Sequence, residues 1–281
     1  MVEVNENFER ISKEIIDKSK SDEIEIRITK DNRSLTRYAN SQIHQNITQR
    51  DIDLSIRAVF GKKIGVSSTT SLEKNSIKSC LKRAENIAKN QKNDPDFKGL
   101  PEPQKCKYKQ NNYVKKTAEF TPNMRAEKVK EIIEIANNKG VDRVFGAFRT
   151  GTQHLFVANS KGIMRESKTT SANLTTSTIV DWENDQGFGW GETCSANVND
   201  IDHVRISNNA IEKGLNNLDP KKIEPKEYDV ILEPLAVKSI IEYLDIMGFS
   251  GKKVQEERSF MTNKFGERIM DKQVNIYDDV F

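Results

Sequence analysis

The sequence predicts an α+β protein built from a duplicated helix–antiparallel sheet–helix module, followed by the start of a β-rich C-terminal domain. Two stretches of similar length each show a helical apolar repeat, several segments of strand-like alternation and a second helical repeat. The motif Ala-Asn-Ser occurs at residues 39–41 and 158–160, an offset of 119 residues, and closes a predicted strand in both places. We therefore expect a first module at 1–92, a linker at 93–120, a second module at 121–220 and an incomplete third domain at 227–281.

The first module is expected to open with a helix over residues 6–19, where apolar residues recur every three to four positions. Residues 24–28 then alternate isoleucine with charged side chains, which is typical of a half-buried strand. Residues 70–73, Thr-Ser-Leu-Glu, match a capping box, so the second helix is expected to begin at Thr70. Further short strands are expected at 35–38, 42–48, 52–60 and 64–69.

The second module repeats this order after a linker rich in proline, lysine and asparagine. Thr121 is a good N-cap, Pro122 fits the first helical position, and Gly140 is expected to end the helix. A glycine-rich turn at 187–191 is expected to lead into a helix at 201–215. The strands between these helices are expected at 144–150, 154–159, 162–167 and 172–181.

The third segment begins near Tyr228 with a predicted strand at 229–232. A helix is expected to begin at Pro234 and to end at Gly248. The chain then stops at Phe281, and a domain of about 50 residues is marginal on its own. This domain is therefore expected to be incomplete, through truncation of the gene product or because the chain is a fragment.

Composition excludes several classes of protein. The 281 residues hold 45 lysines and arginines against 42 acidic residues, which argues against nucleic acid as the main partner. No apolar run reaches the roughly 18 residues of a membrane helix, and no secretory h-region is visible. We expect a soluble, cytoplasmic protein without membrane association. The three cysteines, Cys80, Cys106 and Cys194, form no CxxC pair and are expected to be buried thiols.

The residues offer no self-sufficient catalytic group. The histidines, His44, His154 and His203, form no HExxH pattern and are expected to be ordinary surface or half-buried side chains. The most unusual short stretch consists of Gly187, Phe188, Gly189, Trp190 and Gly191. Its favoured interpretation is a flexible turn whose aromatic rings pack on the sheet. The alternative is an exposed edge where a peptide substrate binds beside backbone and aromatic faces.

Three segments together resemble the TldD/PmbA family, also called the modulator-of-DNA-gyrase family. They are residues 36–45 (TRYANSQIHQ), 56–65 (IRAVFGKKIG) and 228–234 (YDVILEP). Shorter matches follow at 249–251, 258–260, 265–266 and 278–279. The resemblance implies an α/β N-terminal region and a β-rich C-terminal domain in an intracellular protein. TldD-type members are metalloproteases with HExxxH on the helix after the Tyr-Asp-Val strand. PmbA-type, or TldE, members lack that motif and pair with TldD, and the pair trims extended, unfolded peptides and processes peptide-antibiotic precursors.

This sequence departs from the TldD pattern on that helix. Residues 235–244 read LAVKSIIEYL, where Glu242 is the only metal-binding side chain and would hold zinc poorly. The resemblance therefore implies a PmbA/TldE-like chain with no catalytic residue, no metal ligand and no cofactor of its own. Zinc is expected in a TldD-type partner subunit, with which this chain would form a heterodimer, a homodimer being the other possibility. A degenerate stand-alone binding module is the alternative, and an autonomous metallopeptidase is the least favoured reading.

Overall fold

The computed structural model describes residues 7–105, 112–141, 143–183 and 185–278. The chain divides into two compact units, Met1–Pro220 and Lys221–Phe281.

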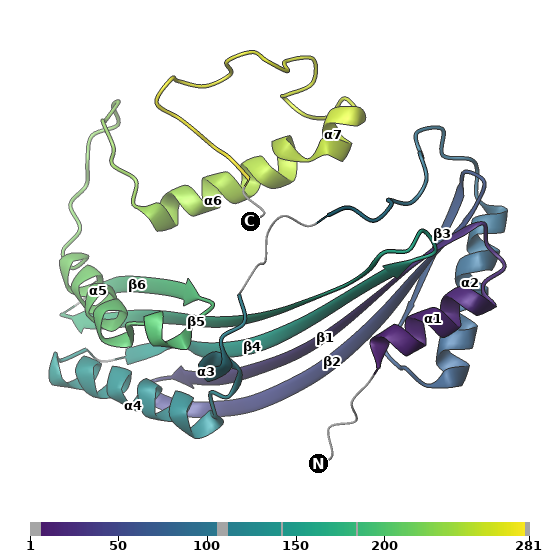
Figure 1. Ribbon diagram of the computed structural model, residues 1–281. Helices are drawn as coiled ribbons and strands as arrows, with labels where there is room; N and C mark the ends of the chain where they lie inside the picture. The colour runs from purple at the N-terminus through teal and green to yellow at the C-terminus, as the bar shows by residue number, and fades with distance from the viewer. Residues whose placement is uncertain (1–6, 106–111, 142, 184, 279–281) are drawn as a thin grey trace. The chain divides into compact units, whose positions relative to one another are not determined.

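The first unit contains both predicted modules, each with three antiparallel strands between helices (Figure 1). The first module consists of α1 (Phe8–Lys18), β1 (Glu23–Ala39), β2 (Gln42–Phe60), β3 (Lys63–Thr69) and α2 (Lys74–Asn90). The second consists of α3 (Lys115–Ala118), α4 (Pro122–Asn138), β4 (Arg143–Asn159), β5 (Met164–Trp182), β6 (Asp185–Ser195), a 3₁₀ turn (Val198–Asp200) and α5 (His203–Asn216). The predicted α+β class is confirmed, and α3 lies inside the stretch expected to be a linker.

The two modules share one six-stranded sheet in the order β3-β2-β1-β4-β5-β6. The central strands β1 and β4 pair antiparallel over most of their length, with Asn32 opposite Thr152 near the middle. The short strand predicted at 64–69 is confirmed as β3. The other predicted short strands are wrong as separate elements, because they merge in pairs into strands of 17 to 19 residues. The polar middle of β1 is hydrogen-bonded to β2 and β4, so its continuity does not depend on apolar alternation.

The repeated Ala-Asn-Ser motif closes a strand in each module, as predicted, and joins it to the other module. Asn40 and Ser41 have φ angles of 49° and 56°, as a two-residue hairpin turn requires. The Ser41 N–H donates to Val144 O over 3.1 Å, and the Ser160 N–H donates to Ile24 O over 2.9 Å. The two serines thus extend the β1–β4 pairing at opposite ends of the sheet.

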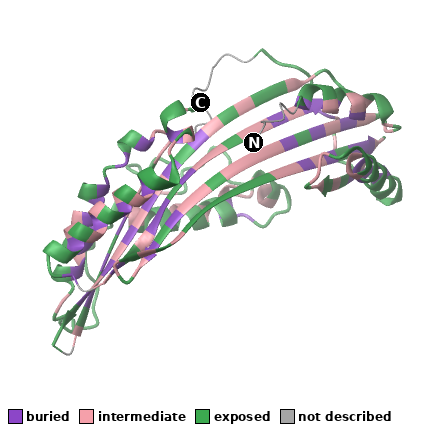
Figure 2. Cartoon of the chain, turned by 90° about the horizontal axis from the view of Figure 1, so that it is seen from below, coloured by how far each residue is buried: buried purple, intermediate pink, exposed green. Residues whose placement is uncertain are grey.

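The apolar core has two parts, one at each end of the same face of the sheet. Even-numbered side chains of β1 point to this face, so Ile24, Ile26 and Ile28 lie in a cluster with residues of α1 and α2. Further along β1, Tyr38 lies in a second cluster with residues of α4 and α5. In Figure 2 the buried residues gather toward the ends of the strands, while the middle is largely intermediate or exposed.

The ends of two helices show which capping predictions hold. The Thr121 side chain accepts a hydrogen bond from the Met124 N–H, with Pro122 at the first helical position, as predicted. The predicted start of α2 at Thr70 is wrong, because the helix begins at Lys74. The Ser71 hydroxyl accepts from the Glu73 N–H at 3.2 Å in a local turn, so no capping box forms.

The stretch at 187–191 is an extended strand, so the prediction of a turn there is wrong. It lies within β6 at one edge of the sheet, and its glycines face α5. A Cβ on Gly189 would overlap the Ala210 carbonyl oxygen and the Gly214 nitrogen. The same contact occurs in the first module, where a Cβ on Gly65 would overlap backbone atoms of α2. Glycine here permits close helix–strand packing and does not break the strand.

The second unit contains α6 (Pro234–Leu244), a π-helical turn (Asp245–Phe249) and α7 (Gly251–Gln255). The helix begins at Pro234, as predicted. The strand predicted at 229–232 does not form, and Ile231 is 99% exposed. A strand needs a neighbour for its backbone groups, and residues 221–278 contain no strand to supply one. Across the described ranges, no helix is both long and apolar enough to cross a membrane.

Candidate functional site

The face of the sheet opposite the helices carries many polar side chains. We call it the open face: it presents the odd-numbered side chains of β1, β4 and β5. Leu100 of the linker is buried at one corner, where its N–H donates to Glu23 Oε2 at 2.7 Å. Seven arginines occupy strand positions on this face: Arg27, Arg33, Arg37, Arg57, Arg143, Arg149 and Arg165.

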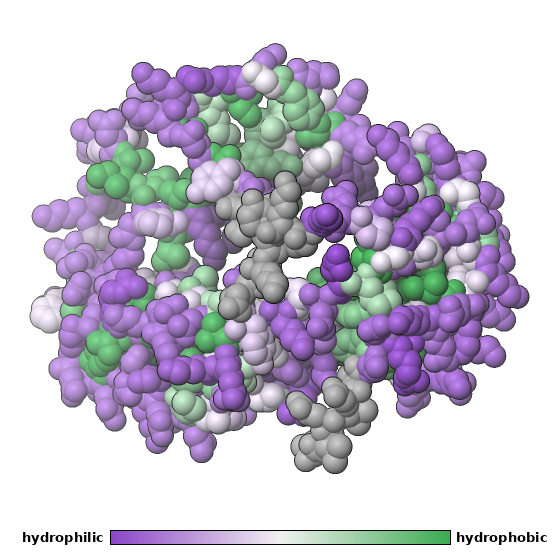
Figure 3. All heavy atoms as spheres, viewed as in Figure 1, coloured by the Kyte–Doolittle hydropathy of each residue, from purple (hydrophilic) through white to green (hydrophobic). Residues whose placement is uncertain are grey.

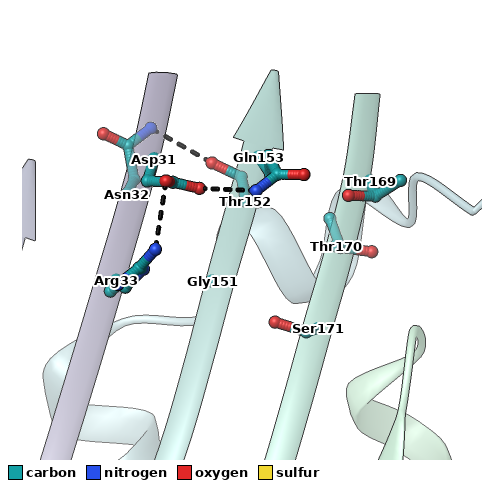
Figure 4. A pocket seen from close by; sticks show the side chains of 9 residues that line it. All are labelled: Asp31, Asn32, Arg33, Gly151, Thr152, Gln153, Thr169, Thr170 and Ser171. Atoms are coloured by element: carbon teal, nitrogen blue, oxygen red, sulfur yellow. Dashed lines mark hydrogen bonds and ion pairs between the residues drawn. The ribbon is translucent and has the colours of Figure 1, made fainter. Parts of the chain in front are cut away.

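A hollow of about 200 Å³ lies at the middle of β1, β4 and β5, close to the point where the two modules meet (Figure 4). A side chain at Gly151 would lie 3.1 Å from the Asn32 carbonyl oxygen and 3.4 Å from Ser171 Oγ. Because Gly151 has no side chain, the hollow has room for a small polar group at this position. The hollow is lined by Asp31, Asn32, Arg33, Gly151, Thr152, Gln153, Thr169, Thr170 and Ser171.

Asp31 organises one wall of this hollow. Its carboxylate accepts from Gln153 Nε2 at 3.0 Å and from Arg33 Nη2 at 3.1 Å. Nearby, Asn32 Nδ2 donates to Thr152 Oγ1 at 3.1 Å across the β1–β4 pair. Figure 4 shows the three contacts on β1 and β4; the Asn32–Thr152 contact belongs to the helix side of the sheet, because both residues are even-numbered. The site offers a carboxylate, a guanidinium and several hydroxyls, which suits hydrogen bonding to a polar ligand.

Beneath the same strands, on the helix side, lies a fully buried arginine. Arg125 of α4 donates to Thr36 Oγ1 at 3.3 Å, to Thr150 Oγ1 at 3.0 Å and to the Phe120 carbonyl oxygen at 2.9 Å. Burial lowers the pKa of the Arg125 guanidinium. These contacts fix the start of α4 on the central strands. Sequence reasoning missed Arg125 and the hollow. The polar segment 29–34, which supplies three of the residues that line the hollow, falls between two predicted strands.

The predicted substrate-binding residues lie on β6, the edge strand, with alternate side chains on opposite faces. Gly187, Gly189 and Gly191 are buried, whereas Phe188 is 54% exposed and Trp190 is 43% exposed. The turn of the favoured interpretation does not form, and both rings lie about half exposed on the sheet face opposite α5. The two rings share the open face with the arginines. Substrate binding at these residues stays a prediction.

The histidines lie on the predicted strands and helix, but His203 is buried, so the prediction of a surface or half-buried side chain is wrong there. His154 of β4 lies 2.8 Å from Glu166 Oε2 and beside the Phe8 ring. His203, the first residue of α5, lies 2.5 Å from Glu131 Oε2 of α4. The hydrogen bond from His203 lowers the pKa of Glu131. His44 lies in β2, where the pairing with β1 shifts by one residue.

The cysteines differ from one another. Cys80 is buried, as predicted, and burial raises the pKa of its thiol. Cys194 is exposed on β6, so the prediction of a buried thiol is wrong there. Its side chain projects from the edge strand on the face away from α5. Cys106 lies outside the described residues.

The donor set of α6 does not fit a hydrolytic zinc. Its one carboxylate, Glu242, lies 3.8 Å from Lys238 Nζ, and the helix carries no imidazole or thiol. Over the part of the chain that the structure describes, no group of three or more His, Cys, Asp or Glu side chains is placed to hold a metal ion.

Two copies of a module form one antiparallel sheet, with β1 of the first paired to β4 of the second and helices on one face. The chain is therefore a duplicated α+β protein. Three models of the PmbA/TldA metallopeptidase family match the chain: domain 1 over residues 24–88, the central domain over 115–218 and the C-terminal domain over 225–281. The chain belongs to this TldD/PmbA family.

Two solved structures illustrate the similarity. A protein described as a modulator of DNA gyrase from Thermotoga maritima aligns with a TM-score of 0.82 at 19% identity, covering 92% of this chain and 60% of that one. TldE from Thermococcus kodakarensis aligns with a TM-score of 0.74 at 19% identity, covering 91% and 57%. Similarity at this level of identity shows the fold.

A curated relative, an uncharacterized protein of Methanocaldococcus jannaschii, is 22% identical over 229 residues. The match covers 80% of this chain and 51% of the relative. The chain therefore spans about half the length of this curated relative.

Proposed function

We propose that this chain is a TldE-like, non-catalytic component of a TldD-type metalloprotease system that acts on unfolded or extended peptides. The observation that carries the proposal is the donor set of α6. This helix lies within the matched C-terminal domain and follows the segment 228–234, after which the family resemblance leads us to expect HExxxH. Here only Glu242 has a metal-binding side chain. Peptide hydrolysis needs an activated water, which zinc would supply in the partner subunit.

The open face and β6 are suited to holding an extended substrate. An edge strand can pair with a peptide backbone, while aromatic rings and arginines contact its side chains. Phe188 and Trp190 project from this edge onto the same face as Asp31 and Arg33. This chain would position the peptide, and the partner would cleave it.

Co-expression with a TldD-type partner that carries HExxxH tests the proposal. We expect the two chains to co-purify and the complex to cleave an unfolded peptide in a zinc-dependent way. The partner alone should cleave it at least about tenfold more slowly. Failure to co-purify, with partner activity unchanged by this chain, would contradict the proposal.

A matched pair of variants tests the role of β6. Replacing Phe188 and Trp190 by serine should raise KM for the peptide without preventing complex formation. The control is Trp182→Ser, which removes a ring that is 59% exposed at the end of β5. Equal effects of the two changes would argue against substrate binding at β6.

Two other functions have distinct signatures. A stand-alone binding module would be a stable monomer whose level does not depend on any protease partner. An autonomous metallopeptidase would contain one zinc per chain and lose peptide cleavage in a chelator. Metal analysis of the isolated chain distinguishes the autonomous metallopeptidase from the proposed function. The mass of the chain in solution distinguishes a monomer from a homodimer.

A further inference from the structure

A groove of about 630 Å³ lies between α1 and α2 at the first-module end of the sheet. The two helices rest on different strands, α1 on β1 and β4 and α2 on β2 and β3. The apolar side chains in the groove are recessed: Ile15 and Leu81 are buried, and Ile11 and Ile77 are half-buried. In Figure 3 an apolar patch ringed by hydrophilic surface lies on the side of the molecule that carries these helices.

Lysines dominate the rim of this groove. Lys74, Lys78 and Lys82 are exposed and follow one another at intervals of four residues, about 6 Å apart along α2. Among the residues that the structure describes, these three ammonium groups form no ion pair, although Lys74 is near enough to Glu14 to contribute to the lowered pKa of that carboxyl.

The two acidic residues of the groove already have partners. The Glu14 carboxylate pairs with Lys18, which lowers the pKa of Glu14. Glu85 accepts from the Lys20 N–H at 2.7 Å and from Ser19 Oγ at 3.2 Å, at the end of α1. The rim therefore keeps a surplus of positive charge beside an apolar floor.

We propose that this groove binds an acidic amphipathic helix of another polypeptide. Such a helix would place its apolar side chains on the isoleucine and leucine floor. Carboxylates one turn apart would then face the lysines of α2, which have the same spacing. The proposal does not depend on a protease partner, because the groove is formed by this chain alone.

The geometry favours a helix over other acidic ligands. Membrane insertion needs protruding apolar side chains, and here they are recessed between two helices. Duplex nucleic acid is bound through phosphate contacts, which need no apolar floor. Single strands are bound through aromatic stacking, and none of the described residues that line this groove is aromatic. A small anion would engage one or two lysines, whereas these three are spread along two turns.

Fluorescence anisotropy with a labelled amphipathic peptide of roughly 18 residues, rich in leucine and glutamate, tests the proposal on the full chain. We expect saturable binding that weakens as salt rises from about 50 to about 300 mM. Changing Lys74, Lys78 and Lys82 together to glutamate should weaken binding at least about tenfold, and glutamine at the same positions should have an intermediate effect.

The control chain carries glutamate in place of three exposed lysines of the second module, Lys116, Lys130 and Lys139, which gives the same change in net charge. It should bind within about twofold of the unchanged chain. Equal binding of a scrambled peptide or of a lysine-for-glutamate peptide would overturn the proposal. The proposal would also be overturned if the two triple variants weakened peptide binding equally. A further contradicting result would be binding of anionic vesicles or duplex DNA that depends on the three lysines, without binding of the peptide.

Discussion

The two ends of the sheet are built to the same plan but hold their helices differently. In both modules, a glycine of the third strand lets a helix approach through small residues, Gly65 under α2 and Gly189 under α5. At the second-module end, α4 and α5 pack together and are joined by the Glu131–His203 contact. At the first-module end, α1 and α2 leave a groove between them. The duplication has kept the helix–strand contact, and the helix–helix contact differs.

The largest expected effect is on the stability of the folded chain, and it differs between substitutions of Gly189 and Gly65. Gly189→Ala should lower the free energy of unfolding by about 3 kcal/mol, because the new Cβ overlaps α5 backbone and α4 keeps that helix from moving away. Gly65→Ala should cost less, about 1–2 kcal/mol, because α2 can shift toward the open groove. Urea denaturation of both variants measures the difference.

The control for this pair is Trp190→Ala, which removes an exposed ring from the other face of β6 and should change stability by less than about 1 kcal/mol. Equal losses for Gly65→Ala and Gly189→Ala would show that the spacing of the helices does not matter.

Replacing the serines of the two Ala-Asn-Ser motifs, Ser160 and Ser41, should lower stability by smaller amounts that differ from each other. Ser160 Oγ accepts from the Ile24 N–H at 3.0 Å, and Ser41 Oγ accepts from the Val144 N–H at 3.4 Å. Ser160→Ala should therefore cost about 1 kcal/mol, and Ser41→Ala about half as much. Thermal unfolding of the two variants tests the order, and the reverse order would mean that the longer contact holds the modules together more firmly.

The smallest expected effect is on pH dependence. Hydrogen bonds from Lys161 and His203 lower the pKa values of Glu23 and Glu131 below the usual 4.5. Both carboxylates therefore stabilise the folded chain above about pH 4.5, and this contribution is lost as the pH falls through their lowered pKa values.

Urea midpoints measured from neutral pH to about pH 3 should fall less steeply in Glu23→Gln and in Glu131→Gln than in the unchanged chain. An unchanged pH slope in one of the variants would show that its end of the sheet contributes nothing to acid sensitivity.

Much of the fold was visible in the sequence because its signals are local. The alternation of Ile24, Ile26 and Ile28, and the cap at Thr121 with Pro122, depend only on neighbouring residues and were predicted correctly. The Ala-Asn-Ser repeat correctly indicated two related modules. The sequence favoured a turn at residues 187–191 and offered an exposed sheet edge as the alternative, because a run of glycines is typical of turns.

The sequence by itself determined the α+β class, the duplication and the lack of zinc ligands on the helix that begins at Pro234. Only the tertiary structure decided that the two modules share one sheet, that polar segments such as 29–34 continue as strand, and that Gly189 faces α5. It alone placed Asp31 beside Gln153, and the lysines of α2 beside α1. The physical reason is the distance along the chain between the interacting elements. The β1–β4 pairing joins residues more than a hundred positions apart, and the groove joins helices about sixty positions apart, so no local sequence pattern predicts either.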